Sequence, residues 1–159
     1  MKHILFVCTG NSCRSVMAEG LLRHLLQQAG IEKVTVESAG VFAIDGVPPT
    51  RETQVVLREA GVDCSHHRAR ALTSQMIHDA DVVLAMEQFQ VEEILRRAPS
   101  AKGTVFLLKS YGLPSGESPG RSPTIADPIG KPLEVYEVCL LDIREAVERI
   151  AKSLGALSG

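Results

Sequence analysis

The sequence predicts an α/β fold: one domain with a four-stranded, parallel, twisted sheet flanked by helices on both faces. Three observations predict it. Short apolar runs alternate with helical patterns along the chain, which indicates strands joined by right-handed crossovers. The apolar runs are continuous rather than alternating, as is typical of strands buried on both faces. Finally, the 159 residues are enough for one sizeable core and no repeat divides them, so we expect a single domain over residues 1–159.

Four continuous apolar runs are the predicted strands, and they span residues 4–8, 34–37, 82–86 and 105–108. Helical patterns lie between or after them, at residues 15–29, 50–60, 74–80, 88–97 and 133–154. The first two helical patterns stop at Gly30 and Gly61, and glycine is the usual residue just past a helix end. The last pattern places an apolar stripe on one face, made by Cys139, Ile143, Ala146, Val147, Ile150 and Leu154. This order of elements predicts a Rossmann-like sheet.

Residues 112–132 fit neither pattern, since nine of these 21 residues are glycine or proline. Such a long irregular segment inside a compact domain is usually functional or disordered. It contains Asp127-Pro128, and Pro128 restricts Asp127 to extended backbone, which fixes the direction of its carboxyl group. A carboxylic acid placed in this way supplies a proton to a leaving group; the alternative is an ordinary Asp-Pro turn.

The most informative segment joins the first predicted strand to the first predicted helix and runs from Cys8 to Ser15 as Cys-Thr-Gly-Asn-Ser-Cys-Arg-Ser. Ligands of open α/β sheets bind beyond the carboxyl ends of the strands, which is where Cys8 stands. The N–H groups of the loop and of the helix start favour an oxyanion and the thiolate form of the cysteine. Gly10 and Asn11 are residue types that tolerate left-handed backbone. Arg14 offers two parallel donors to a phosphate group, and Ser15 offers a hydrogen bond to the thiol.

Spacing alone does not identify this site, because a cysteine followed six residues later by an arginine occurs twice. The second pair is Cys64 and Arg70. Its intervening residues contain no glycine, it follows no apolar strand, and no helical pattern begins at its arginine. The strand before Cys8 and the helix after it therefore favour the first match, and they indicate a thiol nucleophile facing phosphate rather than a tight turn with a buried cysteine.

Composition excludes several classes of function. The net charge of −2 gives no reason to expect nucleic acid as the main partner, and no apolar stretch approaches the roughly 20 residues of a membrane span. The first residues lack a signal-peptide pattern, so we expect a cytoplasmic protein, and the charge and patterning suggest a monomer. Four cysteines in 159 residues do not indicate a disulfide framework, so we expect reduced thiols.

Together these motifs resemble the low-molecular-weight protein tyrosine phosphatases over essentially the full chain, in a bacterial branch near the protein-arginine phosphatases. The resemblance is carried by residues 8–15, 17–19 (Met-Ala-Glu), 38–40 (Ser-Ala-Gly) and 81–86, and by Asp127-Pro128 followed by Tyr136. It implies a phosphatase that needs no metal or cofactor and acts on a phosphorylated protein. It also implies that Cys8 is the nucleophile that forms a phosphocysteine, that Arg14 binds the phosphate and the transition state, and that Asp127 is the general acid and then the base for water.

The resemblance assigns supporting roles as well. Asn11 is implied to hold the shape of the loop, with support from Ser38 and His67. The other implied phosphate-binding residues are Thr9, Gly10, Ser12, Cys13 and Ser15. Cys13 is further implied to form a reversible disulfide with Cys8 that protects the nucleophile from over-oxidation; the alternative is a packing thiol.

The remaining cysteines and histidines have simpler expected roles. Cys64 and Cys139 are expected to be buried packing residues. A zinc site built from Cys64, His66 and His67 lacks the spacing of zinc ligands, so we expect no metal. For His67, a surface or capping role is the alternative to support of the loop.

Phosphotyrosine is the first expected substrate, because it is the usual substrate of the family that the chain resembles. Tyrosine-selective members have two tyrosines after Asp-Pro, whereas here Ile129 and Gly130 follow, and Phe42 is the only obvious aromatic candidate for the wall of the site. Phosphoarginine is the alternative, known in bacterial relatives that carry Thr where this chain has Ser12. A hydroxyl there can contact a guanidinium, whereas tyrosine phosphatases often have an aliphatic residue. Ser12, Phe42 and Ile129 are therefore the predicted selectivity residues.

Two other functions share the same loop. Thioredoxin-linked arsenate reductases have nearly the same Cys-to-Ser segment, but they need two further cysteines just after the third strand. This chain reads Leu-Ala-Met-Glu-Gln-Phe at residues 84–89 and lacks them. A non-catalytic phosphate-binding module has no use for a thiol at the start of the loop or for an acid on the lid. Both functions are therefore less favoured than a phosphatase.

Overall fold

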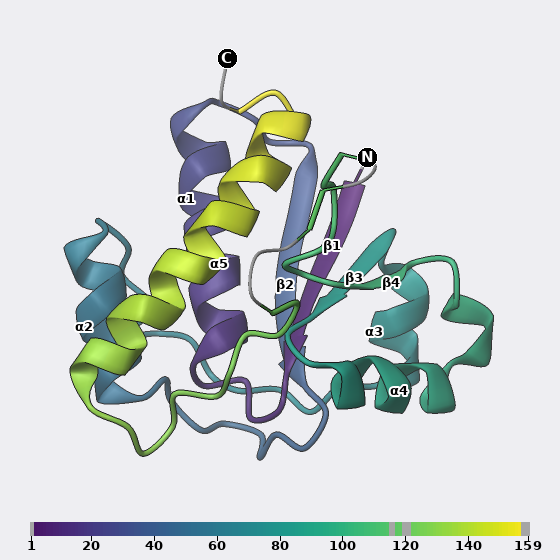
Figure 1. The fold of residues 1–159 in the computed structure, drawn as a ribbon, viewed down its shortest axis with the longest axis horizontal. Coiled ribbons are helices and arrows are strands. Elements are labelled where there is room, and N and C mark those ends of the chain that lie inside the picture. Colours follow the sequence, from purple (N-terminus) through teal and green to yellow (C-terminus); the bar gives the residue numbers. More distant parts are fainter. Residues whose placement is uncertain (1, 115–116, 119–121, 157–159) are drawn as a thin grey trace.

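A computed structural model describes residues 2–114, 117–118 and 122–156, and their strands and helices follow the predicted order (Figure 1). The strands are β1 (Lys2–Cys8), β2 (Val34–Gly40), β3 (Val82–Ala85) and β4 (Val105–Leu107). The helices are α1 (Arg14–Gln28), α2 (Arg51–Glu59), α3 (Ser74–Asp79), α4 (Gln88–Arg97) and α5 (Leu133–Ser153), and a single 3-10 turn, η1, spans Pro99–Ala101. The largest difference from prediction is that β2 continues to Gly40 instead of ending at residue 37, because it stays paired with β1 along its whole length.

The four strands form one parallel sheet in the order β2-β1-β3-β4, which confirms the predicted sheet. The chain leaves β1 toward β2 on one side and later returns to place β3 on the other side. The carboxyl ends of β1 and β3 therefore lie beside each other at the point where the strand order reverses, which is the usual ligand site of such sheets. Cys8 is the last residue of β1 and stands at this point.

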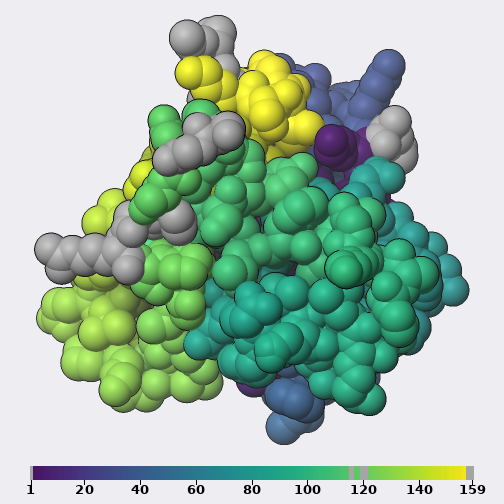
Figure 2. Space-filling model, turned by 45° about the vertical axis from the view of Figure 1, so that its right-hand side comes forward, coloured from purple at the N-terminus to yellow at the C-terminus, as the bar shows by residue number. Residues whose placement is uncertain are grey.

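Helices cover both faces of the sheet, as predicted (Figure 1). On one face, alternate β1 residues Ile4 and Phe6 pack in a buried cluster with residues of α1, α2 and α5. On the other face, Leu5 and Val7 pack in a second cluster with residues of α3 and α4. The space-filling view shows the residues of α4 and β4 closing over that side of the molecule (Figure 2). The two cores hold β1 from both faces and so fix the position of the residue at its end.

The segment that follows β4 is irregular, as the glycine and proline content predicted, although residues 115–116 and 119–121 lie outside the described residues. Its later part returns to the sheet, because Ile125 N–H donates to the Met86 carbonyl at 3.0 Å, just beyond β3. This bond brings residue 127 to the carboxyl edge of the sheet. In the part of the chain that the structure describes, no helix combines the length and the apolar character needed to cross a membrane.

Candidate active site

The Cys8 thiol is buried at the end of β1 and is held by two polar contacts. Ser15 Oγ lies 2.9 Å from Cys8 Sγ, and the Asn11 backbone N–H donates to the same sulfur at 3.3 Å. Ser15 belongs to the first turn of α1, so the start of that helix faces the thiol. Donors at this place stabilise a negatively charged sulfur and an oxyanion next to it.

Asn11 is the centre of the loop's hydrogen bonds. Its φ of 54° is the only positive value among the described non-glycine residues. Its side-chain N–H groups donate to Ser15 Oγ at 2.7 Å and to Ser38 Oγ at 2.9 Å, and its side-chain oxygen accepts from Arg70 N–H at 2.9 Å. His67 Nε2 lies 3.2 Å from the Asn11 carbonyl oxygen, which can only accept, so this nitrogen carries the proton. Together with Cys8 Sγ, which accepts from the Asn11 backbone N–H, five partner groups hold the left-handed residue that turns the loop.

A carboxylate that was not expected from the sequence completes this network. Ser38 Oγ donates a short hydrogen bond to Glu19 Oε1, and Glu19 also pairs with Arg23 at 3.1 Å. Burial lowers the pKa of His67, and the nearby Glu19 charge opposes that shift. The neutral imidazole is therefore favoured next to Asn11. The sequence could have indicated this position of Glu19, because residues four apart on a helix are neighbours and Glu19 follows Ser15 by four residues in α1.

The loop also depends on a glycine outside it. Of the two loop residues whose types tolerate left-handed backbone, Asn11 adopts it and Gly10 does not. A Cβ added at Gly10 would meet only Ser12 Oγ, at 3.7 Å. A Cβ added at Gly40 would overlap the Thr9 carbonyl oxygen and lie 3.0 Å from the Asn11 nitrogen. The close approach of β2 to the loop therefore requires glycine at position 40.

The Arg14 guanidinium is almost completely buried and is oriented from one side. Its Nη1 donates to Glu87 Oε2 and to the Ile125 carbonyl, both at 2.7 Å, and its Nη2 lies 3.8 Å from Asp127 Oδ2. Its buried Nε has no hydrogen-bond partner among the described residues. A buried donor without a partner is costly, and an oxyanion bound in the loop would satisfy it.

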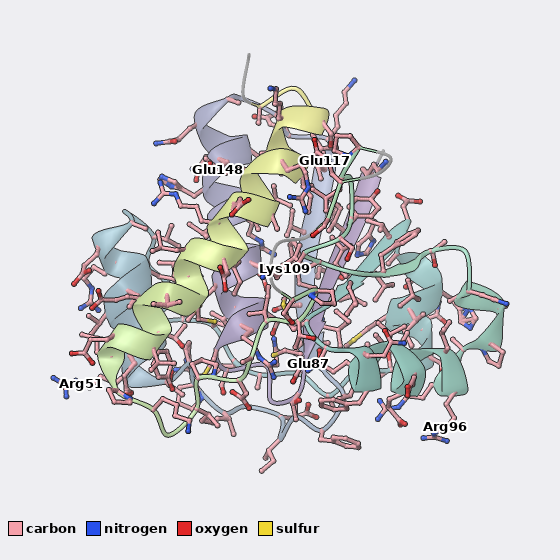
Figure 3. The ribbon with its side chains drawn as sticks, in the orientation of Figure 1. Arg51, Glu87, Arg96, Lys109, Glu117 and Glu148 are labelled. Atoms are coloured by element: carbon pink, nitrogen blue, oxygen red, sulfur yellow. The ribbon has the colours of Figure 1, made fainter. Side chains whose placement is uncertain are left out.

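Glu87, which is labelled in Figure 3, and Gln90 join the loop to the turn after β3, and sequence reasoning missed both. Gln90 is fully buried, and its Oε1 accepts from the backbone N–H groups of Met86 at 2.9 Å and Glu87 at 3.0 Å. Its Nε2 donates to Thr9 Oγ1 at 3.1 Å. The strand order alone could have indicated both residues, because β3 is paired with β1 and the residues that directly follow β3 must lie beside the end of β1.

Asp127 reaches the same place from the irregular segment. Its side chain is 41% exposed, and its Oδ1 accepts from Ile129 N–H at 3.1 Å, which leaves Oδ2 facing Arg14. One cavity of about 250 Å³ is lined by Cys8, Thr9, Gly10, Ser12, Cys13, Arg14, Asp127 and Ile129. The predicted nucleophile, phosphate ligand and acid therefore meet in a single cavity.

The three predicted selectivity residues are placed differently. Ser12 and Ile129 line the cavity, Ser12 nearly buried and Ile129 55% exposed. Phe42 is 63% exposed and lies next to the loop, since its N–H donates to the Thr9 carbonyl at 3.0 Å, but it does not line the cavity. The cavity lining thus combines small residues, the charged Arg14 and Asp127, and one aliphatic side chain, that of Ile129.

All four cysteines are free thiols in this structure. Cys13 Sγ lies 3.5 Å from Thr50 Oγ1 and 3.8 Å from the Tyr136 hydroxyl. Cys64 and Cys139 are buried, as expected for packing residues, and burial raises the pKa of their thiols to about 11 and about 12. Those two thiols are therefore protonated and poorly reactive near neutral pH.

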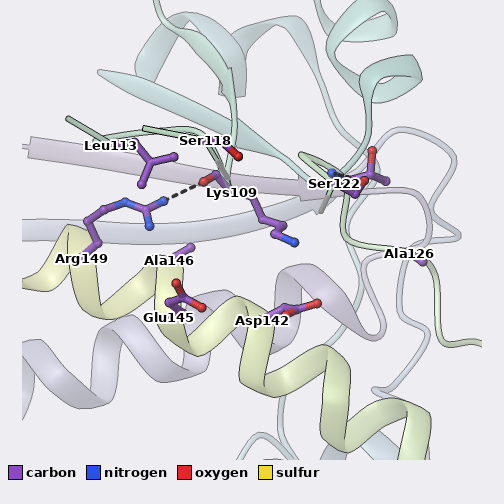
Figure 4. Close-up of a pocket in the computed structure, with 10 residues that line it drawn as sticks. Lys109, Leu113, Ser118, Ser122, Ala126, Asp142, Glu145, Ala146 and Arg149 are labelled. Atoms are coloured by element: carbon purple, nitrogen blue, oxygen red, sulfur yellow. Dashed lines mark hydrogen bonds between the residues drawn. The ribbon is translucent and has the colours of Figure 1, made fainter. Parts of the chain in front are cut away.

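A second cavity of about 610 Å³ lies between α5 and the irregular segment that follows β4 (Figure 4). Arg149 of α5 lines one end of it and donates to the backbone carbonyls of Tyr111 at 2.8 Å and Lys109 at 3.0 Å. Ala126, which precedes Asp127, lines its other end. Arg149 thus ties the beginning of the irregular segment to the last helix.

Comparison with known proteins places this site in a family. The model of the low molecular weight phosphotyrosine protein phosphatases matches residues 3–157. The protein-arginine-phosphatase of Geobacillus stearothermophilus is 40% identical over 96% of this chain and 95% of its own, and the solved YwlE arginine phosphatase of that organism has a TM-score of 0.85 at 39% identity, over 98% and 94%. The probable low molecular weight protein-tyrosine-phosphatase EpsP of Ralstonia nicotianae is 38% identical over 99% of both chains. The tyrosine phosphatase Wzb of Escherichia coli K30, solved with sulphate, has a TM-score of 0.84 at 31% identity, over 97% and 99%.

Proposed function

Because this chain belongs to the low molecular weight phosphotyrosine protein phosphatase family, we propose that residues 1–159 form one catalytic domain that hydrolyses phosphorylated protein side chains through Cys8. One observation carries the proposal: the Cys8 thiol, the Arg14 guanidinium and the Asp127 carboxyl group line the same cavity at the carboxyl edge of the sheet. This set supplies a nucleophile, a phosphate ligand and a proton donor.

In the first step, the Cys8 thiolate attacks phosphorus, and the S–P bond forms as the bond to the leaving group breaks. Asp127 donates its proton to the departing oxygen or nitrogen atom, because a leaving group of high basicity cannot depart unprotonated. The loop N–H groups and Arg14 stabilise the charge on the three phosphoryl oxygens. Asn11 N–H and Ser15, both hydrogen-bonded to the sulfur, stabilise the thiolate before attack.

In the second step, water replaces the departed group. The Asp127 carboxylate accepts a proton from that water, whose oxygen attacks the phosphocysteine, and the S–P bond breaks. Inorganic phosphate and the Cys8 thiolate are the products. Asp127 is 41% exposed, which gives it access both to a bulky leaving group and to solvent water.

Phosphotyrosine is the first candidate substrate, because the matching family is named for it and because the similar protein EpsP is named a probable tyrosine phosphatase. Ile129 at the cavity wall and the exposed Phe42 ring beside the loop are the apolar surfaces available to a phenyl ring.

Phosphoarginine is the second candidate, and the wall of the cavity favours it. Ser12 presents a hydroxyl group in the lining, and no aromatic side chain belongs to that lining. A guanidinium group needs hydrogen-bond acceptors, which Ser12 and Asp127 offer, whereas a phenyl ring gains most from aromatic contacts. The similar protein of Geobacillus stearothermophilus is named an arginine phosphatase.

The deciding experiment compares kcat/KM for phosphotyrosine and phosphoarginine in the same peptide. We expect both to be hydrolysed by the wild-type chain and neither by Cys8→Ala. Ser12→Ile should shift the ratio toward phosphotyrosine, because it replaces a hydroxyl by an aliphatic group, and Ser12→Thr, which keeps the hydroxyl, should not. An unchanged ratio in Ser12→Ile would contradict the role given to Ser12, and release of phosphate by Cys8→Ala would contradict the mechanism.

We further propose that the chain acts as a monomer in the cytoplasm and that Cys13 forms a reversible disulfide with Cys8 under oxidation. Four cysteines in 159 residues do not indicate a disulfide framework, which supports a reducing compartment. For the disulfide, Cys13 Sγ has to leave its contact with Thr50. Sedimentation tests the monomer, and a stable dimer would contradict it. Peptide mapping after peroxide treatment tests the disulfide, and the absence of a linked Cys8–Cys13 peptide would contradict it.

A further inference from the structure

We propose that Gln90 is a positioning residue that ties the phosphate loop to the turn after β3, and that this tie sets the affinity of the site for phosphate. The inference rests on the phosphate site of the proposed function but not on turnover. Gln90 touches neither the nucleophile nor the cavity. Its effect passes through Thr9 on one side and Glu87 on the other.

The first arm reaches the loop directly. Gln90 Nε2 donates to Thr9 Oγ1 at 3.1 Å, and Thr9 is the residue after the nucleophile. Gln90 is fully buried, so a water molecule can replace Thr9 as the partner of its Nε2 only if the core opens. Among the described residues, it is the one polar side chain of α4 that is fully buried.

The second arm reaches Arg14. Gln90 Oε1 accepts from the backbone N–H groups of Met86 and Glu87, which fixes the turn from which the Glu87 side chain departs. Glu87 Oε2 then accepts from Arg14 Nη1 at 2.7 Å. The Met86 carbonyl also holds Ile125 N–H, and the Ile125 carbonyl is the other partner of Arg14 Nη1. Both groups that orient the guanidinium are therefore anchored on the turn that Gln90 holds.

A glutamine at the third position of a helix is a common cap for the N–H groups at the helix start, and capping explains the bonds made by Oε1. It does not explain the bond from Nε2 to Thr9, which joins two different strand ends. The two roles differ in their consequences. A cap affects the stability of α4, whereas the tie to Thr9 affects where the loop N–H groups and Arg14 stand relative to a bound phosphate.

The test measures the dissociation constant of inorganic phosphate by calorimetry, with the melting temperature recorded for each variant. Gln90→Leu removes both arms, and Gln88→Leu is the matched control, because Gln88 is an exposed glutamine of the same helix. We expect phosphate to bind about tenfold more weakly to Gln90→Leu, the scale of one or two lost hydrogen bonds, and unchanged to Gln88→Leu. An unchanged constant in a folded Gln90→Leu protein would overturn the inference.

A second variant keeps the cap intact. Thr9→Val removes the acceptor of the Nε2 bond and leaves the bonds of Gln90 Oε1 in place. We expect weaker phosphate binding in Thr9→Val, and a Gln90→Leu/Thr9→Val double variant whose loss is smaller than the two single losses combined. Wild-type affinity in Thr9→Val would overturn the inference even if Gln90→Leu does not fold, and fully additive losses in folded variants would overturn it as well. A chain that binds phosphate in this manner but releases none from phosphopeptides would contradict the proposed function alone.

Discussion

A methyl group added at Gly40 tests how tightly the phosphate loop is fitted against β2. Gly40 pairs with Cys8 in the sheet, and Val41 N–H donates to the Cys8 carbonyl at 2.9 Å. A Cβ at this position would overlap the Thr9 carbonyl oxygen, and it would lie 2.9 Å from Ala43 Cβ, inside the 3.0 Å limit that real Cβ atoms respect. Gly40→Ala therefore forces a shift of the backbone.

The contacts of Gly40 show which part of the backbone has to move when the methyl group is added. Its N–H donates to the Arg70 carbonyl at 2.9 Å and its carbonyl accepts from Leu72 N–H at 2.8 Å, so the strand end is held on the side away from the loop. The Thr9 backbone is the part that must give way. Overpacking of this kind costs about 1–3 kcal/mol of unfolding free energy. A displacement of about 1 Å in a catalytic loop can lower activity about 100-fold.

Gly103→Ala is the matched control, because a Cβ at Gly103 would meet no heavy atom within 4 Å and its φ is not in the left-handed range. Urea unfolding and kcat/KM for p-nitrophenyl phosphate are measured for both variants. We expect both losses in Gly40→Ala and neither in Gly103→Ala. Wild-type kcat/KM in Gly40→Ala would refute the close fit between β2 and the loop.

Three further predictions follow from the site. Asp127→Ala should keep phosphate binding and lose about 100-fold or more of kcat/KM on phenyl phosphate but less on p-nitrophenyl phosphate, whose leaving group needs no proton; equal losses of kcat/KM on the two esters would contradict the acid role. Iodoacetamide should label Cys8 before Cys64 and Cys139, because burial raises the pKa of those two thiols to about 11 and 12; peptide mapping in the reverse order would contradict this. Burial lowers the pKa of His67 below its ordinary 6.5, so the unfolded chain binds more protons than the folded chain as the pH drops below that value. The free energy of unfolding should therefore fall with the pH in this region, as denaturant titrations at several pH values would show. An equal dependence of that free energy on pH in a His67→Gln variant would contradict this.

The elements and the thiol loop were predictable because their signals are local. A continuous apolar run, a glycine after a helix and a cysteine at the end of a strand are each read within a few residues, and all nine predicted strands and helices are present. Pro128 predicted only the direction of the Asp127 carboxyl group, and the family resemblance indicated its role as the acid. Its contact with Arg14 depends on the Ile125 bond to the end of β3.

The supporting residues were not predictable in the same way, because they act across strands that are distant in sequence. Glu87 and Gln90 reach the loop only because β3 lies next to β1 in the sheet. The need for glycine at position 40 has the same origin. Whether a glycine is needed depends on what stands opposite it, and Gly40 faces the loop although it lies 30 positions after Gly10 in the sequence.

The covalent intermediate tests the central proposal most directly. p-Nitrophenyl phosphate labelled in its phosphoryl group, whose leaving group needs no proton, is mixed with the Asp127→Ala variant. The reaction is quenched within the first turnover, and the labelled residue is identified by peptide mapping. We expect the label on Cys8, in an amount approaching one per chain, because formation of the phosphocysteine needs no acid with this ester, whereas loss of Asp127 slows the attack of water. No label should appear in the Cys8→Ala protein. Release of labelled phosphate without a labelled Cys8 peptide at any time point would contradict the proposal that this chain works through a phosphocysteine.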